Sequence, residues 1–137
     1  MNDVELIKQP YRRSCGQASV AIVSGKPVAD IIQMFGTRGG TTNRKQIEVL
    51  GQLGFRNVRW KRLWNYYPLP VASLLRLRGK PGWGGHTVAF DGERVYDPEL
   101  STVRSLGGFL NYLGRACDLE PWHYRIASQI MWEGSNQ

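Results

Sequence analysis

Cys15 is the residue in this sequence that is best placed to act as a nucleophile. The segment from Ser14 to Val23 reads as a turn that leads directly into a helix, so the thiol falls in the first helical turn. Free backbone N–H groups and the helix dipole favour a thiolate at that position. A thiolate becomes a hydrolytic nucleophile only beside a base and an oxyanion stabiliser. The rest of the chain must therefore supply both.

His86 and Asp97 lie on two strand-like runs that are separated by the dipeptide Asp91-Gly92. A two-residue loop of this kind predicts a type I′ hairpin. In that register Ala89 pairs with Arg94 and His86 with Asp97, and opposed residues have Cβ atoms about 4.5–5.5 Å apart. The carboxylate could then orient the imidazole and stabilise its charged form, as a catalytic triad requires. A surface His–Asp pair at a sheet edge is the non-catalytic alternative.

Four short motifs contain these residues, in the order Gln9, Cys15-Gly16-Gln17-Ala18-Ser19, Gly84-Gly85-His86-Thr87-Val88 and Tyr96-Asp97-Pro98. They resemble papain-like cysteine peptidases, and most closely the compact branch that includes the double-glycine leader peptidases of bacteriocin exporters and their stand-alone relatives. The resemblance covers the chain from Leu6 to Pro98. Thr87 departs from it, because the family carries a bulky residue there, and this leaves the specificity less defined than the chemistry.

This resemblance implies a role for each of four residues. Cys15 would be the nucleophile, His86 the general base and acid, and Asp97 the group that orients the imidazole. The side-chain amide of Gln9 would donate to the oxyanion beside the Cys15 backbone N–H. A solvated loop amide is the alternative for Gln9, since glutamine is mostly exposed.

The elements that must position these residues predict an α+β fold. The expected helices are 15–24, ended by Gly25, then 28–35, closed by Gly36, then one from Thr42 or Asn43 through Leu53, and a later helix over 106–115. The expected strands are a short leading one at 4–8, then 55–60, 71–78, the 86–97 hairpin and 122–130. N-terminal helices that carry the nucleophile would pack on a C-terminal antiparallel sheet, as in papain-like proteins, and the cleft would lie between them.

Two glycine-rich loops are predicted to border this cleft and contact substrate. The first precedes His86 and contributes Trp83, Gly84 and Gly85, since binding residues often lie on loops. It lacks the Walker spacing and the following helix of a phosphate-binding loop. The second spans 37–42 and includes Gly40. A plain connector is the alternative for both loops.

Other residues that could do chemistry offer weaker patterns. Cys117 and His123 could form a second Cys–His pair, but free cysteines are among the most buried residue types. A zinc site built from both cysteines and both histidines lacks the close paired spacing of structural zinc sites. Gln17 is expected to pack or form hydrogen bonds rather than to stabilise charge. We therefore expect no metal and no cofactor.

The composition fits a single domain over 1–137, with 42% hydrophobic residues and an ordinary core. The N-terminus lacks the pattern of a secretory signal, and no apolar run reaches the length of about 18 residues that a membrane span needs. Two cysteines do not make a disulfide framework. We expect a cytoplasmic protein without membrane association, with signal-less delivery into another cell as the alternative.

The net charge of +7 bears on partners. The segment 59–67 mixes basic and aromatic residues, as single-stranded nucleic-acid surfaces do, but no recognised nucleic-acid motif is present. The expected function is hydrolysis of a peptide bond in a protein or peptide, for which an acidic substrate would suit the charge. A deamidase or isopeptidase with the same triad is the first alternative. A catalytically silent basic module that binds nucleic acid or an acidic protein is the second. The sequence indicates no oligomeric state.

Overall fold

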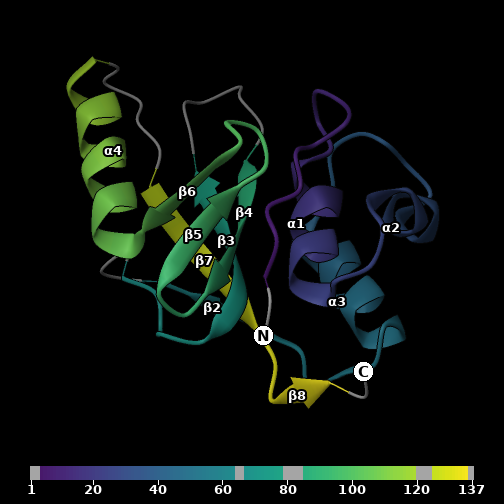
Figure 1. The fold of residues 1–137 in the computed structure, drawn as a ribbon. Helices are drawn as coiled ribbons and strands as arrows, with labels where there is room; N and C mark the ends of the chain where they lie inside the picture. Colours follow the sequence, from purple (N-terminus) through teal and green to yellow (C-terminus); the bar gives the residue numbers. More distant parts are fainter. Residues whose placement is uncertain (1–3, 64–66, 79–84, 120–124, 136–137) are drawn as a thin grey trace.

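An antiparallel sheet with helices on both faces forms the core of the computed structural model, which describes residues 4–63, 67–78, 85–119 and 125–135, with the backbone alone at 115–119 and 135 (Figure 1). The helices of this part are α1 Cys15–Ser24, α2 Val28–Phe35, α3 Asn43–Gln52 and α4 Leu106–Leu119. Its strands are β1 Phe55–Arg56, β2 Arg59–Arg62, β3 Ala72–Arg78, β4 His86–Asp91, β5 Arg94–Asp97, β6 Thr102–Ser105, β7 Arg125–Met131 and β8 Gly134–Ser135. The predicted α+β class is confirmed. In the described ranges, no helix has the length and apolar character needed to cross a membrane.

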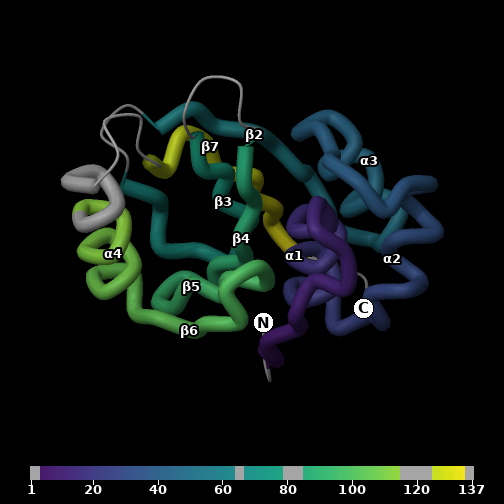
Figure 2. Tube along the Cα trace, turned by 90° about the horizontal axis from the view of Figure 1, so that it is seen from above, coloured from purple at the N-terminus to yellow at the C-terminus, as the bar shows by residue number. Residues whose placement is uncertain are grey.

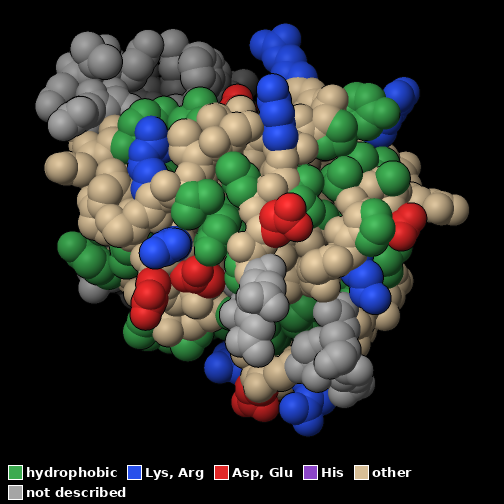
Figure 3. All heavy atoms as spheres, in the orientation of Figure 1, with side chains coloured by type: hydrophobic (Ala, Val, Ile, Leu, Met, Phe, Trp, Pro, Cys, Tyr) green, Lys and Arg blue, Asp and Glu red, His purple; other side chains and the backbone are tan. Residues whose placement is uncertain are grey.

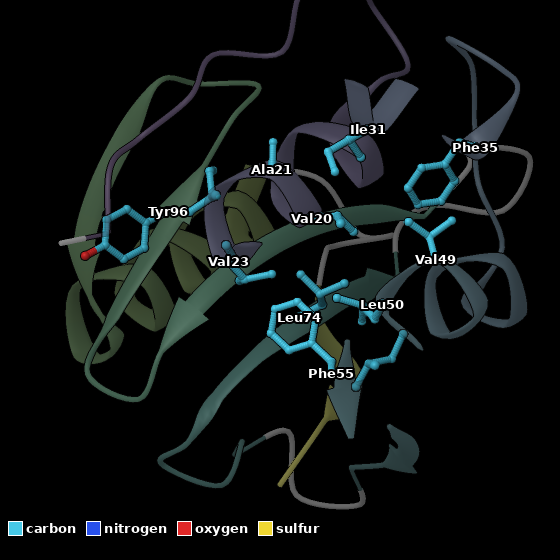
Figure 4. Close-up of a cluster of buried hydrophobic side chains, with 13 residues drawn as sticks. Val20, Ala21, Val23, Ile31, Phe35, Val49, Leu50, Phe55, Leu74 and Tyr96 are labelled. Atoms are coloured by element: carbon cyan, nitrogen blue, oxygen red, sulfur yellow. The ribbon is translucent and has the colours of Figure 1, made fainter. Parts of the chain in front are cut away.

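The main sheet has six strands in the order β2-β7-β3-β4-β5-β6, and β1 pairs with β8 in a separate two-stranded sheet. Helices α1, α2 and α3 lie on one side of the main sheet and α4 on the other, as the view from above shows (Figure 2). Each interface has its own core. One core is formed by residues of α1, α2 and α3 together with Leu74, Ala89, Tyr96 and Ile130 of the sheet (Figure 4). The other joins α4 with Leu75, Val88, Val95 and Ile126. Alternate residues of β3, β4 and β5 thus pack on opposite faces, and a register shift in the pairing of β3 with β7 lets Ile126 and Ile130 face different cores.

The three N-terminal helices begin and end close to their predicted limits. Gly25 and Gly36 end α1 and α2 with φ angles of 70° and 73°, a left-handed conformation that glycine adopts without steric cost. The Thr42 side chain accepts the Lys45 N–H and caps α3. Nine of the ten residues of α1 are buried, so this helix is the central support of the fold.

Several strand predictions are wrong in their limits. Residues 4–8 form no strand; Val4, Leu6 and Ile7 instead pack against the core beside the three N-terminal helices, and the Gln9 N–H directly after them donates to the Pro98 carbonyl at 3.0 Å. The expected strand 55–60 is interrupted at Asn57, whose φ of 51° turns the chain, so that β1 pairs with β8 and β2 with β7. Strand β6, which was not predicted from the sequence, pairs with β5.

The predicted register of the β4–β5 hairpin is also wrong. Ala89 pairs with Tyr96 rather than with Arg94, a shift of two residues. The carboxylate of Asp91 causes this shift, because it accepts the N–H groups of Glu93 and Arg94 at 2.8 and 2.7 Å and the Tyr96 hydroxyl at 2.8 Å. The chain therefore reverses over Gly92-Glu93. Since side chains alternate with a period of two, a two-residue shift keeps the same residues on each face.

Candidate active site

Cys15, His86 and Asp97 each stand at the end of an element: Cys15 opens α1, His86 opens β4, and Asp97 ends β5. Helix α1 packs along β4, and the Ser19 hydroxyl on its second turn donates to the Thr87 carbonyl at 3.0 Å. This packing brings the first turn of the helix to the first residues of the strand. His86 is hydrogen-bonded to Asp97, and it lies close enough to Cys15 to lower the pKa of the thiol, so the structure brings the three predicted residues together.

The His86–Asp97 contact joins Nε2 to Oδ1 at 2.9 Å. With the observed register the two residues are diagonal neighbours across β4 and β5, a separation that long side chains can bridge. Asp97 is only 3% exposed, and its Oδ1 also accepts the N–H groups of Glu99 and Leu100 at 3.0 and 3.3 Å. Burial alone would raise the pKa of Asp97, but the hydrogen bond and charge of His86, with these N–H groups, hold it below its ordinary value.

The charges of Cys15 and His86 stabilise one another. Burial would raise the pKa of the Cys15 thiol, but the hydrogen bond and charge of His86, together with the Thr87 backbone N–H, lower it overall. Burial would lower the pKa of His86, yet the hydrogen bonds and charges of Asp97 and Cys15 raise it to about 10. The arrangement therefore favours a thiolate beside an imidazolium, which is the reactive form of a cysteine nucleophile.

The two nitrogens of the His86 ring have different partners. Nε2 of His86 is hydrogen-bonded to Asp97, which leaves Nδ1 as the nitrogen that can exchange a proton with the Cys15 thiol. A second carboxylate faces this nitrogen, because Oε2 of Glu99 lies 3.4 Å from Nδ1. Sequence reasoning missed Glu99. Its place two residues after Asp97, in an Asp-Pro turn, is the signal that could have found it.

A buried polar network holds the start of β4 against the helices. The Gln46 side chain, which is fully buried on α3, donates from Nε2 to the hydroxyls of Thr41 and Thr87 at 2.9 and 3.1 Å. The Thr87 carbonyl in turn accepts the Ser19 hydroxyl, and the Thr87 N–H contributes to lowering the pKa of Cys15. Gln46 was also missed from the sequence, although it stands four residues before Leu50 and so shares the buried face of α3.

The loop 37–42 lies against the first turn of α1. Gln17 is fully buried, as its predicted packing role requires, and its Nε2 donates to the carbonyls of Thr37 and Gly39 at 2.9 and 2.8 Å. Arg38 of the same loop stacks over the Tyr11 ring, with 4.9 Å between the guanidinium carbon and the ring centroid. Gly40, a predicted substrate contact, is exposed on this loop. Substrate contact there stays a prediction.

The other predicted border of the cleft, the loop before His86, is described only at its last residue. Gly85 is exposed directly before His86, and the Arg76 guanidinium lies where a Gly85 side chain would stand. Arg76 Nη1 also donates to the Thr41 carbonyl at 3.2 Å, which ties this end of the sheet to the loop 37–42. Trp83 and Gly84, the other two predicted contacts, lie outside the described residues.

Gln9 lies upstream of the nucleophile, and its amide braces the turn that leads into α1. Nε2 donates to the carbonyls of Tyr11 and Arg12 at 3.0 and 2.8 Å. Donation to an oxyanion would require the amide to leave or share these bonds, so that role stays a prediction. The Cys15 N–H belongs to the first turn of α1, where backbone donors point out of the helix.

Among the described residues, no three histidine, cysteine or acidic side chains are grouped so that they could hold a metal ion. Of the predicted alternatives to the triad, His123 and the side chain of Cys117 lie outside the described part. No family model matches the sequence, and no curated protein matches it. The case for a function therefore depends on the geometry and chemistry of the site.

Proposed function

We propose that the protein is a papain-like cysteine peptidase that cleaves a peptide bond in a protein or peptide substrate. The observation that carries the proposal is the convergence of the Cys15 thiol, at a helix N-terminus, with an imidazole that is hydrogen-bonded to a buried carboxylate, His86 to Asp97. The alternative of a non-catalytic His–Asp pair at a sheet edge gives no reason for a thiol to lie next to the imidazole. The lowered pKa of Cys15 and the raised pKa of His86 support the same assignment.

The proposed reaction has two steps, acylation of Cys15 and then hydrolysis of the thioester, and His86 gives a proton in the first and takes one in the second. The Cys15 thiolate attacks the carbonyl carbon, and the Cys15 N–H stabilises the oxyanion, with the Gln9 amide as the second expected donor. His86 Nδ1 then gives its proton to the leaving nitrogen, the C–N bond breaks, and a thioester forms. Water attacks the thioester as Nδ1 takes its proton, the C–S bond breaks, and the acid leaves. Asp97 holds the ring and its charge throughout.

A nucleic-acid-binding module is less well supported than an enzyme. On the face shown in Figure 3, the Lys and Arg side chains stand apart, among acidic and apolar ones. Strand β2 is basic and exposed over its whole length, as edge strands often are when they avoid pairing with other chains. A deamidase or isopeptidase would use the same triad, and the products distinguish it from a peptidase.

The first test is the pH dependence of alkylation by iodoacetamide, followed by mass mapping of each cysteine. Cys15 should react well below the pKa of about 8.5 of an ordinary thiol, and this advantage should disappear in His86→Ala. Cys117 in the same sample serves as the internal control. If Cys15 titrates as an ordinary thiol with His86 intact, the proposal fails.

The second test identifies the reaction with a peptide library and the Cys15→Ala variant as the matched control. Cleaved backbone bonds that depend on Cys15 would support the peptidase. Release of ammonia from glutamine side chains, or of lysine amines from isopeptide bonds, would assign the alternative instead. A library that is processed equally by Cys15→Ala would refute the role of the thiol.

A further inference from the structure

The carboxylate of Glu99 occupies a position that the proposed triad chemistry does not use. Its Oε2 lies 3.4 Å from Nδ1 of His86, and the Glu99 side chain is 56% exposed whereas the ring is 12% exposed. The contact is therefore made from the solvent side of the ring. A group that approaches this side of His86 meets the carboxylate.

The backbone holds Glu99 in fixed relation to the triad. Its N–H donates to Oδ1 of Asp97 at 3.0 Å, the oxygen that also binds His86. The preceding carbonyl, of Pro98, accepts the Gln9 N–H at 3.0 Å. The turn is thus fixed on both sides, while the exposed end of the side chain can exchange one partner for another. This is the arrangement of a binding group rather than of a buried structural ion.

Glu99 lies on the side of His86 from which the leaving group of the substrate would depart. In the proposed mechanism Nδ1 of His86 gives its proton to the departing nitrogen, so the residue after the scissile bond passes beside Nδ1. A carboxylate there attracts a cation and repels an anion. The net charge of the chain is +7, so its overall charge would not by itself attract a cationic substrate to this position.

The opposite border of the site has the opposite charge. The Arg76 guanidinium lies against Gly85 and donates to the Thr41 carbonyl, on the side of the loop 37–42. A preference for positive charge is therefore expected at the leaving-group side alone and not along the whole cleft. This localisation distinguishes a specificity residue from a general attraction between protein and substrate.

Building on the proposed function, we propose that Glu99 is a specificity-determining residue that selects substrates with a lysine or arginine side chain directly after the scissile bond. The carboxylate would leave the imidazole and pair with the substrate cation. An exposed ion pair of this kind contributes up to about 1 kcal/mol, which corresponds to a preference of about five-fold. A cationic and an anionic substrate should differ by more than either differs from a neutral one.

The first experiment measures the charge at the site without any substrate. Cys15 is modified with a cationic and with an anionic methanethiosulfonate of similar size, and the ratio of the two rates is determined by mass mapping. Glu99→Gln should lower the cationic-to-anionic ratio by about three- to ten-fold, since both reagents respond to the lost charge. Glu93→Gln is the matched control, because Glu93 is exposed beyond the opposite end of β5. An unchanged ratio in Glu99→Gln would overturn the proposal.

The second experiment compares peptides that carry lysine, glutamine or glutamate directly after the cleaved bond. The wild type should prefer lysine over glutamate, and Glu99→Gln should remove most of this preference while cleaving the glutamine peptide. Equal cleavage of all three by the wild type would refute the selectivity. If the reagent ratio responds to Glu99 but no peptide is cleaved, the peptidase assignment fails while the negative charge beside the imidazole is retained.

Discussion

Replacing Gly16 with alanine should destabilise the protein, although alanine is the better helix former. A Cβ atom at position 16 would stand 2.2 Å from Oγ1 of Thr41 and 2.9 Å from Nε2 of Gln46. The first distance is far inside van der Waals contact. Thr41 must therefore move, and the hydrogen bond that it accepts from Gln46 is strained or lost.

The expected size follows from three contributions. Alanine in place of glycine favours the helix by up to about 1 kcal/mol. Forcing an extra methyl group into a packed site costs about 1–3 kcal/mol. Losing the Gln46–Thr41 hydrogen bond costs about 1 kcal/mol more. Gly16→Ala should thus lower the free energy of unfolding by about 1–3 kcal/mol in total.

The assay is urea-induced unfolding, with Gly51→Ala as the matched control. Gly51 also lies in a helix, but no atom stands within 4 Å of the place that a Cβ would take there, so alanine should be neutral or stabilising. In the Gly16→Ala background, Thr41→Ala should cost less than it does alone, because the clashing hydroxyl is removed. If Gly16→Ala is as stable as Gly51→Ala, the close approach of Thr41 to α1 is wrong.

Two further predictions concern the charges of the triad. The pKa of His86 is raised to about 10 in the folded protein, so its stabilising contribution is complete below its ordinary pKa of 6.5 and is lost as the pH rises through about 10. The difference in Tm between the wild type and His86→Ala should therefore shrink at the alkaline end of a pH series, and a constant difference would contradict the charged imidazole. Asp97→Asn keeps an acceptor for His86 and for the turn but removes the charge, so the circular dichroism spectrum should be retained while turnover falls by about 10²-fold or more. Full activity in Asp97→Asn would show that this carboxylate does not support the ring.

The limits of α1, α2 and α3 could be predicted from the sequence because local chemistry sets them, whereas α4 continues to Leu119 beyond its predicted end at 115. Gly25 and Gly36 supply the left-handed residue that ends a helix, and the Thr42 hydroxyl supplies the first-turn acceptor. None of these effects depends on distant parts of the chain. The class of the fold follows from the same local patterns, read in order.

The hairpin register could not be predicted in the same way, because one side chain decides it. The dipeptide Asp91-Gly92 predicts a turn with Asp91 inside it, but the Asp91 carboxylate binds the turn from the end of β4 and moves the pairing by two residues. The prediction that His86 meets Asp97 nevertheless holds. The period of two keeps both on one face, and the diagonal contact is within reach.

The polar network and the second carboxylate depend on tertiary packing. Gln46 is buried because α3 packs near the start of β4, and although its spacing from Leu50 places it on the buried face of α3, its partners Thr41 and Thr87 come from other parts of the chain. The interruption of the strand at Asn57 likewise follows from pairing of β1 and β2 with different partners. Such features require the assembled fold and cannot be read from short segments.

The division of the triad between two halves of the chain has a consequence during synthesis. Cys15 leaves the ribosome first, but the side chains that lower its pKa come from β4 and β5, far later in the sequence. Until His86 and Asp97 have emerged and the hairpin has packed on α1, the thiol of the nascent polypeptide has ordinary nucleophilicity. The lowered pKa of Cys15 therefore arises only after translation has passed the hairpin and the hairpin has packed on α1.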